Sequence, residues 1–249
     1  MDVKNCVDEY YHPTMDLIYT ENNIPGPGID FIEFESEFIN GCSCETLCLN
    51  CSCAFGNKNY KNGCIEEKIG PIIECNSHCH CNENCGNRLV QKGPLNCLNI
   101  IKTEGRGFGL STSEFIKKGQ FVCEYAGEVI DIEEAKKRFE RNEKGVNYVL
   151  IVNEHIGEKI IKTCIDPSLI GNIGRYCNHS CESNCRLVPV RVEKASPRIC
   201  LFARRNIESG EEITFNYAEG VDISVHNISE TPCLCGSSNC LRYLPHNSV

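Results

Sequence analysis

The sequence lacks tryptophan entirely, has two methionines among its 249 residues, and is short of basic groups, with a formal net charge of −9. This charge argues against a free-standing DNA-binding surface, where a basic patch would be expected, and favours a Lys- and Arg-rich peptide as partner. No apolar run approaches the roughly 18 residues of a membrane span. Residues 1–11 lack the basic start and apolar stretch of a signal peptide. We therefore expect a soluble, intracellular, monomeric chain without a membrane segment or a dedicated DNA-binding domain.

Cysteine, by contrast, is abundant, with 21 residues. Disulfides do not persist in a reducing compartment, and close Cys-x-Cys pairs suit metal ligation because neighbouring thiolates can reach one ion. Nine cysteines fall into two adjacent groups. Isolated tetrahedral zinc sites would use eight or twelve ligands, so nine thiolates fit three zinc ions only if three of them bridge. The nine are Cys42, Cys44, Cys48, Cys51, Cys53, Cys75, Cys79, Cys81 and Cys85.

Three residues near these groups leave alternatives open. Cys64 lies alone between the groups, and its isolated position favours a free thiol. His78 and His80 alternate with the second group, and either could replace a thiolate at zinc.

A second cluster near the end of the chain supplies the three thiols of Cys233, Cys235 and Cys240 and lacks a fourth. Cys181 is the most attractive additional donor, and Cys177 and Cys185 are the competing candidates. A zinc ion bound in this way would contribute folding energy and join the C-terminal segment to the middle of the chain.

Between the clusters, short β-prone segments broken by glycine predict small curved sheets instead of a doubly wound fold. Residues 1–40 show no strong period, and residues 218–232 are polar enough to predict a flexible link. The predicted strands are Cys97–Thr103, Gln120–Tyr125, Glu128–Ile130, Val146–Val152, Ile160–Ile165, Leu187–Val192 and Ile199–Ala203.

One surface helix is predicted within this β-rich region. Asp131 and Glu134 have the spacing of a capping box at its start. Ala135 and Phe139 lie one turn apart on its apolar side, and Gly145 can end it.

The most polar stretch, residues 175–184, combines a cation, amides, an imidazole and thiols. Such content is typical of a buried polar crossing of the chain or of a ligand site. The glycine loop at residues 105–110 matches neither a P-loop nor a dinucleotide fingerprint. Phe215 and Tyr217, two residues apart on one strand face, could form an ordinary core pair. No nucleophile elbow is present, which disfavours Ser- or Cys-dependent hydrolysis.

The order of these motifs resembles that of SET-domain protein lysine methyltransferases with pre-SET and post-SET modules. The motifs are the nine-cysteine cluster, Arg106–Leu110, Tyr125–Glu128, Gly174–Cys181, Phe215–Tyr217 and the C-terminal cysteines. Residues 91–93, 121–129 and 170–175 are most similar to the methyltransferase half of SETMAR-type proteins, without their transposase domain. The resemblance implies an N-terminal segment (1–40), a pre-SET trinuclear zinc module (41–88), a SET catalytic domain with a pseudoknot-like threading (89–217), and a post-SET linker, single-zinc module and tail (218–249).

The resemblance also implies roles for individual residues. Tyr217 matches the catalytic tyrosine, and Tyr125 and Phe215 match the walls of a lysine channel. Cys42, Cys48 and Cys75 would bridge the zinc ions. S-adenosylmethionine would contact Arg106, Gly107, Phe108, Tyr148, Arg175, Asn178, His179 and Leu234.

The implied activity is methyl transfer from S-adenosylmethionine to a lysine of the histone H3 tail or nucleosome, in the nucleus on chromatin. SETMAR-type similarity favours the thirty-sixth-position or fourth-position lysine, and Phe215 favours products at least as far as dimethyl-lysine. The alternatives are the ninth-position lysine and a catalytically weak, zinc-rich chromatin-binding module. Phe108, Tyr176 and Ser183 depart from the family pattern, where tryptophan, phenylalanine and proline are common.

Overall fold

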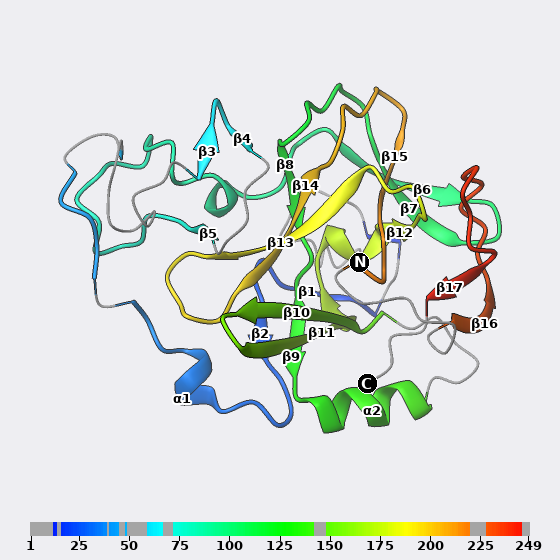
Figure 1. The fold of residues 1–249 in the computed structure, drawn as a ribbon, viewed down its shortest axis with the longest axis horizontal. Coiled ribbons are helices and arrows are strands. Elements are labelled where there is room, and N and C mark those ends of the chain that lie inside the picture. The colour runs from blue at the N-terminus through cyan, green and yellow to red at the C-terminus, as the bar shows by residue number, and fades with distance from the viewer. Residues whose placement is uncertain are drawn as a thin grey trace, which may run out of the picture.

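Short strands arranged in several small sheets make up most of the molecule, and one well-formed helix lies at its edge (Figure 1). The computed structural model describes residues 12–13, 16–38, 40–44, 48, 59–66, 72–141, 148–219 and 228–245. The predicted class, mostly β with few helices and small sheets, is confirmed. Within these ranges no helix has the length and apolar content needed to cross a membrane.

The largest sheet joins N-terminal residues to the middle of the chain. Its order is β1-β11-β9-β2, and β10 pairs with β11. β1 runs parallel to β11, and β2 runs parallel to β9. Each of these N-terminal strands has two residues, which are too few for an alternating pattern, so they could not be predicted from sequence. The strands are β1 (Ile18–Tyr19), β2 (Ile24–Pro25), β9 (Gly127–Ile130), β10 (Leu150–Ile156) and β11 (Lys159–Gly171).

Two four-stranded sheets carry most of the remaining core, in the orders β12-β15-β7-β6 and β5-β13-β14-β8. The parallel pairing of β12 with β15 sets Asn178 opposite Thr214 and His179 opposite Phe215, within the polar stretch of residues 175–184. The strands are β5 (Ile72–Ile73), β6 (Leu98–Thr103), β7 (Gly107–Thr112), β8 (Phe121–Glu124), β12 (Asn178–His179), β13 (Cys185–Arg191), β14 (Arg198–Ala203) and β15 (Glu212–Phe215).

The predicted strand positions agree well with the observed ones. Those at 97–103, 120–125, 128–130, 187–192 and 199–203 match β6, β8, β9, β13 and β14 within two residues at each end. β10 begins at Leu150, inside its predicted range, and β11 continues to Gly171.

Two short hairpins complete the strands. One pairs β3 (Tyr60–Lys61) with β4 (Cys64–Ile65), and the other pairs β16 (Ile228–Pro232) with β17 (Tyr243–Pro245). β16 lies within the predicted flexible link, so that prediction was wrong for its last five residues. Residues 220–227 of the link lie outside the described residues.

The helices are α1 (Phe31–Phe34) and α2 (Ile132–Arg141), with 3-10 turns η2 (Val90–Lys92) and η3 (Ile173–Tyr176). Asp131 caps α2 by accepting a 2.7 Å hydrogen bond from the Glu134 backbone N–H. The reciprocal half of the predicted capping box is wrong, because the Asp131 N–H donates to Pro27 and the Glu134 carboxylate accepts from Arg138. Ala135 and Phe139 pack on the sheet as predicted, and Gly145 lies outside the described residues.

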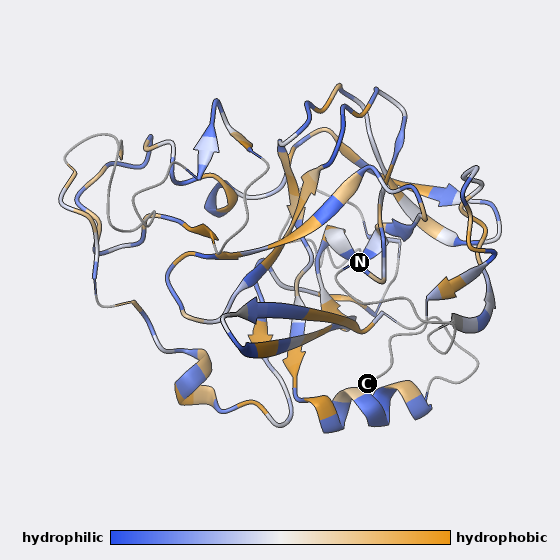
Figure 2. Ribbon diagram, viewed as in Figure 1, coloured by the Kyte–Doolittle hydropathy of each residue, from blue (hydrophilic) through white to orange (hydrophobic). Residues whose placement is uncertain are grey.

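Strand β14 separates two hydrophobic cores. Ile199 and Leu201 belong to the larger core, whereas Cys200 and Phe202 belong to the smaller one. Alternate side chains leave opposite faces of a strand, so a strand buried on both faces reads as a continuous apolar run. Figure 2 shows this run in β14, and hydrophilic residues along the outer side of α2. The larger core positions the ends of β8 and β15, where the candidate site lies.

Candidate active site

Three aromatic side chains meet where β8 and β15 end. Tyr125 directly follows β8, Phe215 ends β15, and Tyr217 lies two residues further on. The Phe215 ring centroid is 5.8 Å from that of Tyr125 and 4.9 Å from that of Tyr217. Phe215 is 1% exposed and Tyr125 is 4% exposed. The structure therefore brings the predicted catalytic tyrosine and the two predicted channel walls into one aromatic cluster (Tyr125, Phe215 and Tyr217).

Both phenol groups of the aromatic cluster are hydrogen-bonded to backbone oxygens. The Tyr217 hydroxyl donates to the Cys177 carbonyl at 3.1 Å, and the Tyr125 hydroxyl donates to the Tyr148 carbonyl at 2.6 Å. Burial raises the pKa of both phenols above the ordinary value for tyrosine. Both side chains are therefore neutral at physiological pH, with their oxygens held in fixed directions.

A carboxylate that the sequence interpretation did not assign connects two predicted cofactor residues. Glu212 accepts hydrogen bonds from both terminal nitrogens of Arg106, at 3.2 and 2.8 Å, and a third from the Asn178 amide at 2.9 Å. The Asn178 amide also donates to the Phe108 carbonyl at 3.2 Å. A Cβ atom at Gly109 would lie 2.7 Å from the Glu212 carboxylate, so this close approach requires glycine. The two consecutive acids at 211 and 212 gave no basis in sequence for choosing the functional one.

Arg175 is enclosed by aromatic rings, as expected for a buried polar crossing. Its guanidinium carbon lies 4.5 Å from the ring centroid of Tyr148 and 5.2 Å from that of Tyr176. Its Nε donates to the Pro167 carbonyl at 3.0 Å, and the residue is 6% exposed. The Tyr176 hydroxyl, which a phenylalanine would lack, lies 3.3 Å from Nδ1 of His12. An N-terminal residue thus contributes to the surroundings of Arg175.

His179 lies between the aromatic cluster and a thiol. Its Nδ1 accepts the Tyr217 backbone N–H at 3.2 Å, and its Nε2 lies 3.3 Å from the Cys181 sulfur. The residue is 4% exposed, and burial lowers its pKa to about 4. The imidazole is therefore neutral near pH 7.

Two exposed apolar side chains lie at the predicted cofactor face. Phe108 is 42% exposed and Leu234 is 53% exposed. A Cβ atom at Gly105 would lie 2.8 Å from Leu234, so the C-terminal segment lies directly against the glycine loop. Gly105 and Gly107 have φ of +69° and +71°, which favour glycine at both positions.

The C-terminal thiol cluster consists of Cys181, Cys233, Cys235 and Cys240, whose sulfur atoms lie within 4.8 Å of one another. Four thiols at this separation suit a tetrahedral zinc ion. The competing donors lie elsewhere. Cys177 and Cys185 are 1% and 0% exposed and belong to the larger hydrophobic core.

The N-terminal thiols form three overlapping groups, each with sulfur atoms within 4.8 Å of one another. Cys42, Cys48 and Cys75, the predicted bridging residues, each belong to two groups, and so does Cys81. Cys51 and Cys53 lie outside the described residues. Among the described residues, no group includes Cys64, His78 or His80. The groups are Cys42, Cys75, Cys79 and Cys81; Cys48, Cys75, Cys81 and Cys85; and Cys42, Cys44 and Cys48.

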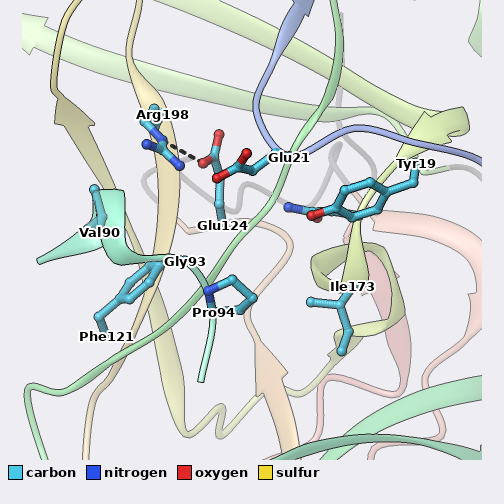
Figure 3. Close-up of a pocket in the computed structure, with 10 residues that line it drawn as sticks. Tyr19, Glu21, Val90, Gly93, Pro94, Phe121, Glu124, Ile173 and Arg198 are labelled. Carbon is cyan, nitrogen blue, oxygen red and sulfur yellow. Dashed lines mark hydrogen bonds and ion pairs between the residues drawn. The ribbon is translucent and has the colours of Figure 1, made fainter. Parts of the chain in front are cut away.

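A separate small pocket lies beside the residue that precedes Tyr125 (Figure 3). Glu124 points into it with one oxygen bonded to Arg198 at 2.6 Å, and its other oxygen has no hydrogen-bond partner among the residues that the structure describes. Burial raises the pKa of this carboxyl, and Glu21 faces it from the N-terminal segment. No residue predicted for catalysis, cofactor or metal lines this pocket. It therefore contains a structural ion pair and lies apart from the aromatic cluster.

Small sheets surround a buried aromatic cluster and a polar crossing, and a thiol cluster lies on each flank. This combination defines the SET-domain architecture. A family profile for the SET domain matches residues 107–218, and one for the Pre-SET motif matches residues 1–88. Histone-lysine N-methyltransferase SETMAR of Mus musculus is 39% identical over 254 residues, which cover 92% of this chain and 81% of that protein.

Two further comparisons agree. Probable histone-lysine N-methyltransferase set-23 of Caenorhabditis elegans is 39% identical, with 92% of this chain and 96% of that protein covered. The crystal structure of the methyltransferase domain of human SETMAR is 36% identical and superposes with a TM-score of 0.83, covering 96% of this chain and 92% of that one. The chain belongs to the SET-domain histone-lysine N-methyltransferases of the SETMAR and SUV39 group, and its activity depends on S-adenosylmethionine.

Proposed function

We propose that this enzyme methylates the thirty-sixth-position or fourth-position lysine of histone H3, at least to the dimethyl state. The observation that carries the proposal is the aromatic cluster, in which Phe215 and Tyr125 are buried beside Tyr217. Similarity to SETMAR over 92% of the chain supports the choice of lysine. Similarity to SUV39H2 of Xenopus tropicalis, at 36% identity, supports the ninth-position lysine as the second candidate.

Catalysis in this proposal is mainly positioning. The substrate amine must be neutral to attack, although free lysine titrates near pH ~10.4. A channel lined by Tyr125 and Phe215 removes water from the ammonium group and lowers its pKa. The neutral Tyr217 hydroxyl, fixed by the Cys177 carbonyl, orients the amine. Because burial raises the pKa of both phenols, neither acts as a tyrosinate base.

The residues of the cofactor face fit a charged, adenine-containing ligand. When bound there, S-adenosylmethionine supplies the methyl group as part of a sulfonium ion. Arg106 and Asn178, held by Glu212, offer hydrogen-bond donors, and the exposed Phe108 and Leu234 offer apolar surface. Gly107, Tyr148, Arg175 and His179 complete the proposed set.

The thiol clusters fit zinc by their donor chemistry. Backbone N–H groups donate to several sulfur atoms, including those of Cys79, Cys85 and Cys181, as they do around metal-bound cysteine sulfur. We infer three ions in the N-terminal cluster, with all nine predicted cysteines as ligands. The fourth ion is held by Cys181 and the three C-terminal cysteines.

The proposed modules are an N-terminal segment (1–40), a pre-SET module (41–88), a SET catalytic domain (89–217) and a post-SET region (218–249). The Pre-SET match over residues 1–88 supports the middle boundary. Because the relatives are histone methyltransferases, the proposed location is the nucleus, on chromatin, with the histone H3 tail as partner.

The proposal is tested by incubating the purified chain with nucleosomes or histone H3 peptides and analysing the products by mass spectrometry. We expect dimethylation at the thirty-sixth- or fourth-position lysine and loss of activity in Tyr217→Phe. Modification restricted to the ninth-position lysine would replace the first candidate by the second. Failure of both histone substrates, with the cofactor bound, would refute the substrate assignment.

A further inference from the structure

One buried side chain contacts both the aromatic cluster and the C-terminal thiol cluster. His179 is 4% exposed and lies on β12, the strand that pairs with β15. Its Nδ1 accepts the backbone N–H of Tyr217 at 3.2 Å. A neutral imidazole carries one N–H, so an accepting Nδ1 puts that proton on Nε2. Nε2 lies 3.3 Å from the Cys181 sulfur, which makes the sulfur the acceptor.

The Cys181 sulfur receives a second N–H, from the Leu241 backbone at 3.4 Å. A sulfur that accepts two N–H groups, with three other cysteine sulfurs within 4.8 Å, has the surroundings of a metal-bound thiolate. Hydrogen bonds to a ligand atom fix its orientation and tune the metal site. His179 is therefore positioned to act on the metal through Cys181.

The other contact of His179 is with Tyr217, which lies beyond the end of the β12–β15 pairing. The β12–β15 pairing ends with His179 opposite Phe215, and Tyr217 lies beyond it. The Tyr217 hydroxyl is held by the Cys177 carbonyl, and its backbone N–H is held by the imidazole. The His179 and Tyr217 rings also pack edge to face, with centroids 5.2 Å apart. Removing the imidazole would remove the acceptor of the Tyr217 backbone N–H and leave the hydrogen bond from the Tyr217 hydroxyl to the Cys177 carbonyl.

We propose that His179 is a positioning residue that couples metal occupancy of the C-terminal thiol cluster to the placement of Tyr217. This inference rests on the proposed metal site and on the proposed role of Tyr217. It gives that metal a role in turnover through one imidazole, in addition to closing Leu234 over the cofactor face. The two roles differ in the kinetic constant that they affect, because closure acts on cofactor affinity and Tyr217 placement acts on kcat.

Two substitutions separate the contacts of His179. In His179→Asn the amide oxygen can replace Nδ1 and still accept the Tyr217 N–H, but it cannot reach Cys181. In His179→Gln the longer amide can still donate to Cys181, but the acceptor for Tyr217 is lost. Each variant therefore keeps one contact and removes the other.

The contact between His179 and the metal-bound Cys181 sulfur is tested by cadmium NMR, with cadmium replacing zinc in the folded protein. We expect His179→Asn to shift the resonance of the C-terminal site and to leave the N-terminal cluster resonances unchanged, whereas His179→Gln should resemble wild type. In wild type, scalar coupling between this cadmium and the His179 Nε2 proton tests the contact without any substitution. Absence of that coupling, with the resonance unmoved in His179→Asn, would overturn the proposal.

The contact between His179 and Tyr217 is tested by measuring kcat of the zinc-loaded variants. We expect kcat of His179→Gln to be roughly 10- to 100-fold below that of His179→Asn, the scale of one lost buried hydrogen bond. Both variants remove the imidazole from the cofactor face, so the comparison between them isolates the contact with Tyr217. His179→Asn should lose activity at a lower chelator concentration than His179→Gln does. Equal kcat in the two variants would show that His179 acts by packing alone.

A third variant distinguishes failure of this inference from failure of the proposed metal site and the proposed function, on which it rests. Cys181→Ser should remove the C-terminal cadmium resonance. If that resonance persists, the proposed metal site itself is wrong. If wild type lacks methyltransferase activity on histone substrates, the proposed function fails, and the NMR experiments still decide whether His179 contacts a metal-bound sulfur.

Discussion

Glu212 is the residue that most directly links the glycine loop to the polar crossing. Its carboxylate holds Arg106 and Asn178, and the ion pair with Arg106 is about one-fifth exposed on each side. Charge-assisted, bidentate hydrogen bonds of this kind are among the strongest available to side chains. Glu212 therefore sets the position of two residues proposed to bind the cofactor.

We expect Glu212→Gln to weaken binding of S-adenosylhomocysteine, measured by calorimetry, roughly 10-fold, because one charged hydrogen bond is replaced by a neutral one. Glu208→Gln, at an exposed neighbouring position, is the matched control and should bind as wild type does. Equal affinities for the two variants would contradict the role given to Glu212.

We propose that Phe215 governs how much space the aromatic cluster leaves beside the substrate amine. Its ring is 1% exposed and packs between Tyr125 and Tyr217. In Phe215→Tyr the added hydroxyl would occupy this space or hold a water there, so we expect products to shift toward monomethyl-lysine. Mass spectrometry of the products measures the shift, and an unchanged product distribution would show that Phe215 does not limit multiplicity.

The neutral phenols of the aromatic cluster also predict a pH dependence. Because burial raises the pKa of Tyr217, no tyrosinate forms near neutral pH, and the titrating group is the substrate amine. We expect kcat/KM for the peptide to rise about tenfold per pH unit up to about pH 9, since the free lysine pKa is near 10.4. A plateau beginning below about pH 8 would indicate a different titrating group.

At the scale of elements, strands β8 and β14 are joined by the buried ion pair of Glu124 and Arg198 in addition to their ladder. The Glu124 side chain is 4% exposed and that of Arg198 is 17% exposed. Removing one partner of a buried pair leaves the other charge uncompensated, which is more costly than losing the attraction alone.

We therefore expect Arg198→Met to lower the free energy of unfolding by about 3 kcal/mol in denaturant titrations of the zinc-loaded protein. Lys61→Met is the control. It removes an ion pair whose side chains are 70% and 68% exposed, and such pairs contribute about 0–1 kcal/mol. A similar loss in both variants would mean that burial of the Glu124–Arg198 pair has no special importance.

At the scale of the whole molecule, segments from both ends of the chain join its central part. The C-terminal cysteines meet Cys181, which follows the polar crossing. The N-terminal strands β1 and β2 extend the sheet that contains β9 and β11. The candidate site is therefore complete only when segments from the start, middle and end of the chain are assembled.

Metal analysis tests this arrangement directly. We expect four zinc ions per chain in wild type, three in Cys181→Ser with loss of activity, and four in Cys177→Ser, because Cys177 lies in the hydrophobic core. Cys177→Ser should retain activity, since the Tyr217 hydroxyl bonds to its backbone carbonyl and not to its thiol. Loss of one ion in Cys177→Ser and not in Cys181→Ser would exchange the roles of the two cysteines.

Local features of the fold were predictable from sequence because they depend on neighbouring residues. The cap at Asp131, the apolar side of α2 and most strands of the central sheets follow from hydrogen bonding and side-chain periodicity within a few residues. The close spacing of cysteines likewise predicted the thiol clusters, and the order of motifs indicated the family.

Contacts between distant segments depended on the path of the chain. The sequence favoured Cys181 as the fourth donor but left Cys177 and Cys185 as alternatives, because all three fall within the same short stretch. The structure separates them, with Cys181 beside the C-terminal cysteines and the other two in the core. The sequence did not predict the contact of His12 with Tyr176 or that of Glu212 with Arg106, because each joins residues far apart in the chain.

The sequence by itself determined the fold class, the helix, most central strands, the thiol clusters and the family. Only the tertiary structure decided which distant side chains meet, including the contacts of His179 with Tyr217 and Cys181. The physical reason is that spacing and periodicity encode interactions along one segment. The partner of a buried polar group, by contrast, is set by which other segments the packed sheets bring within hydrogen-bonding distance.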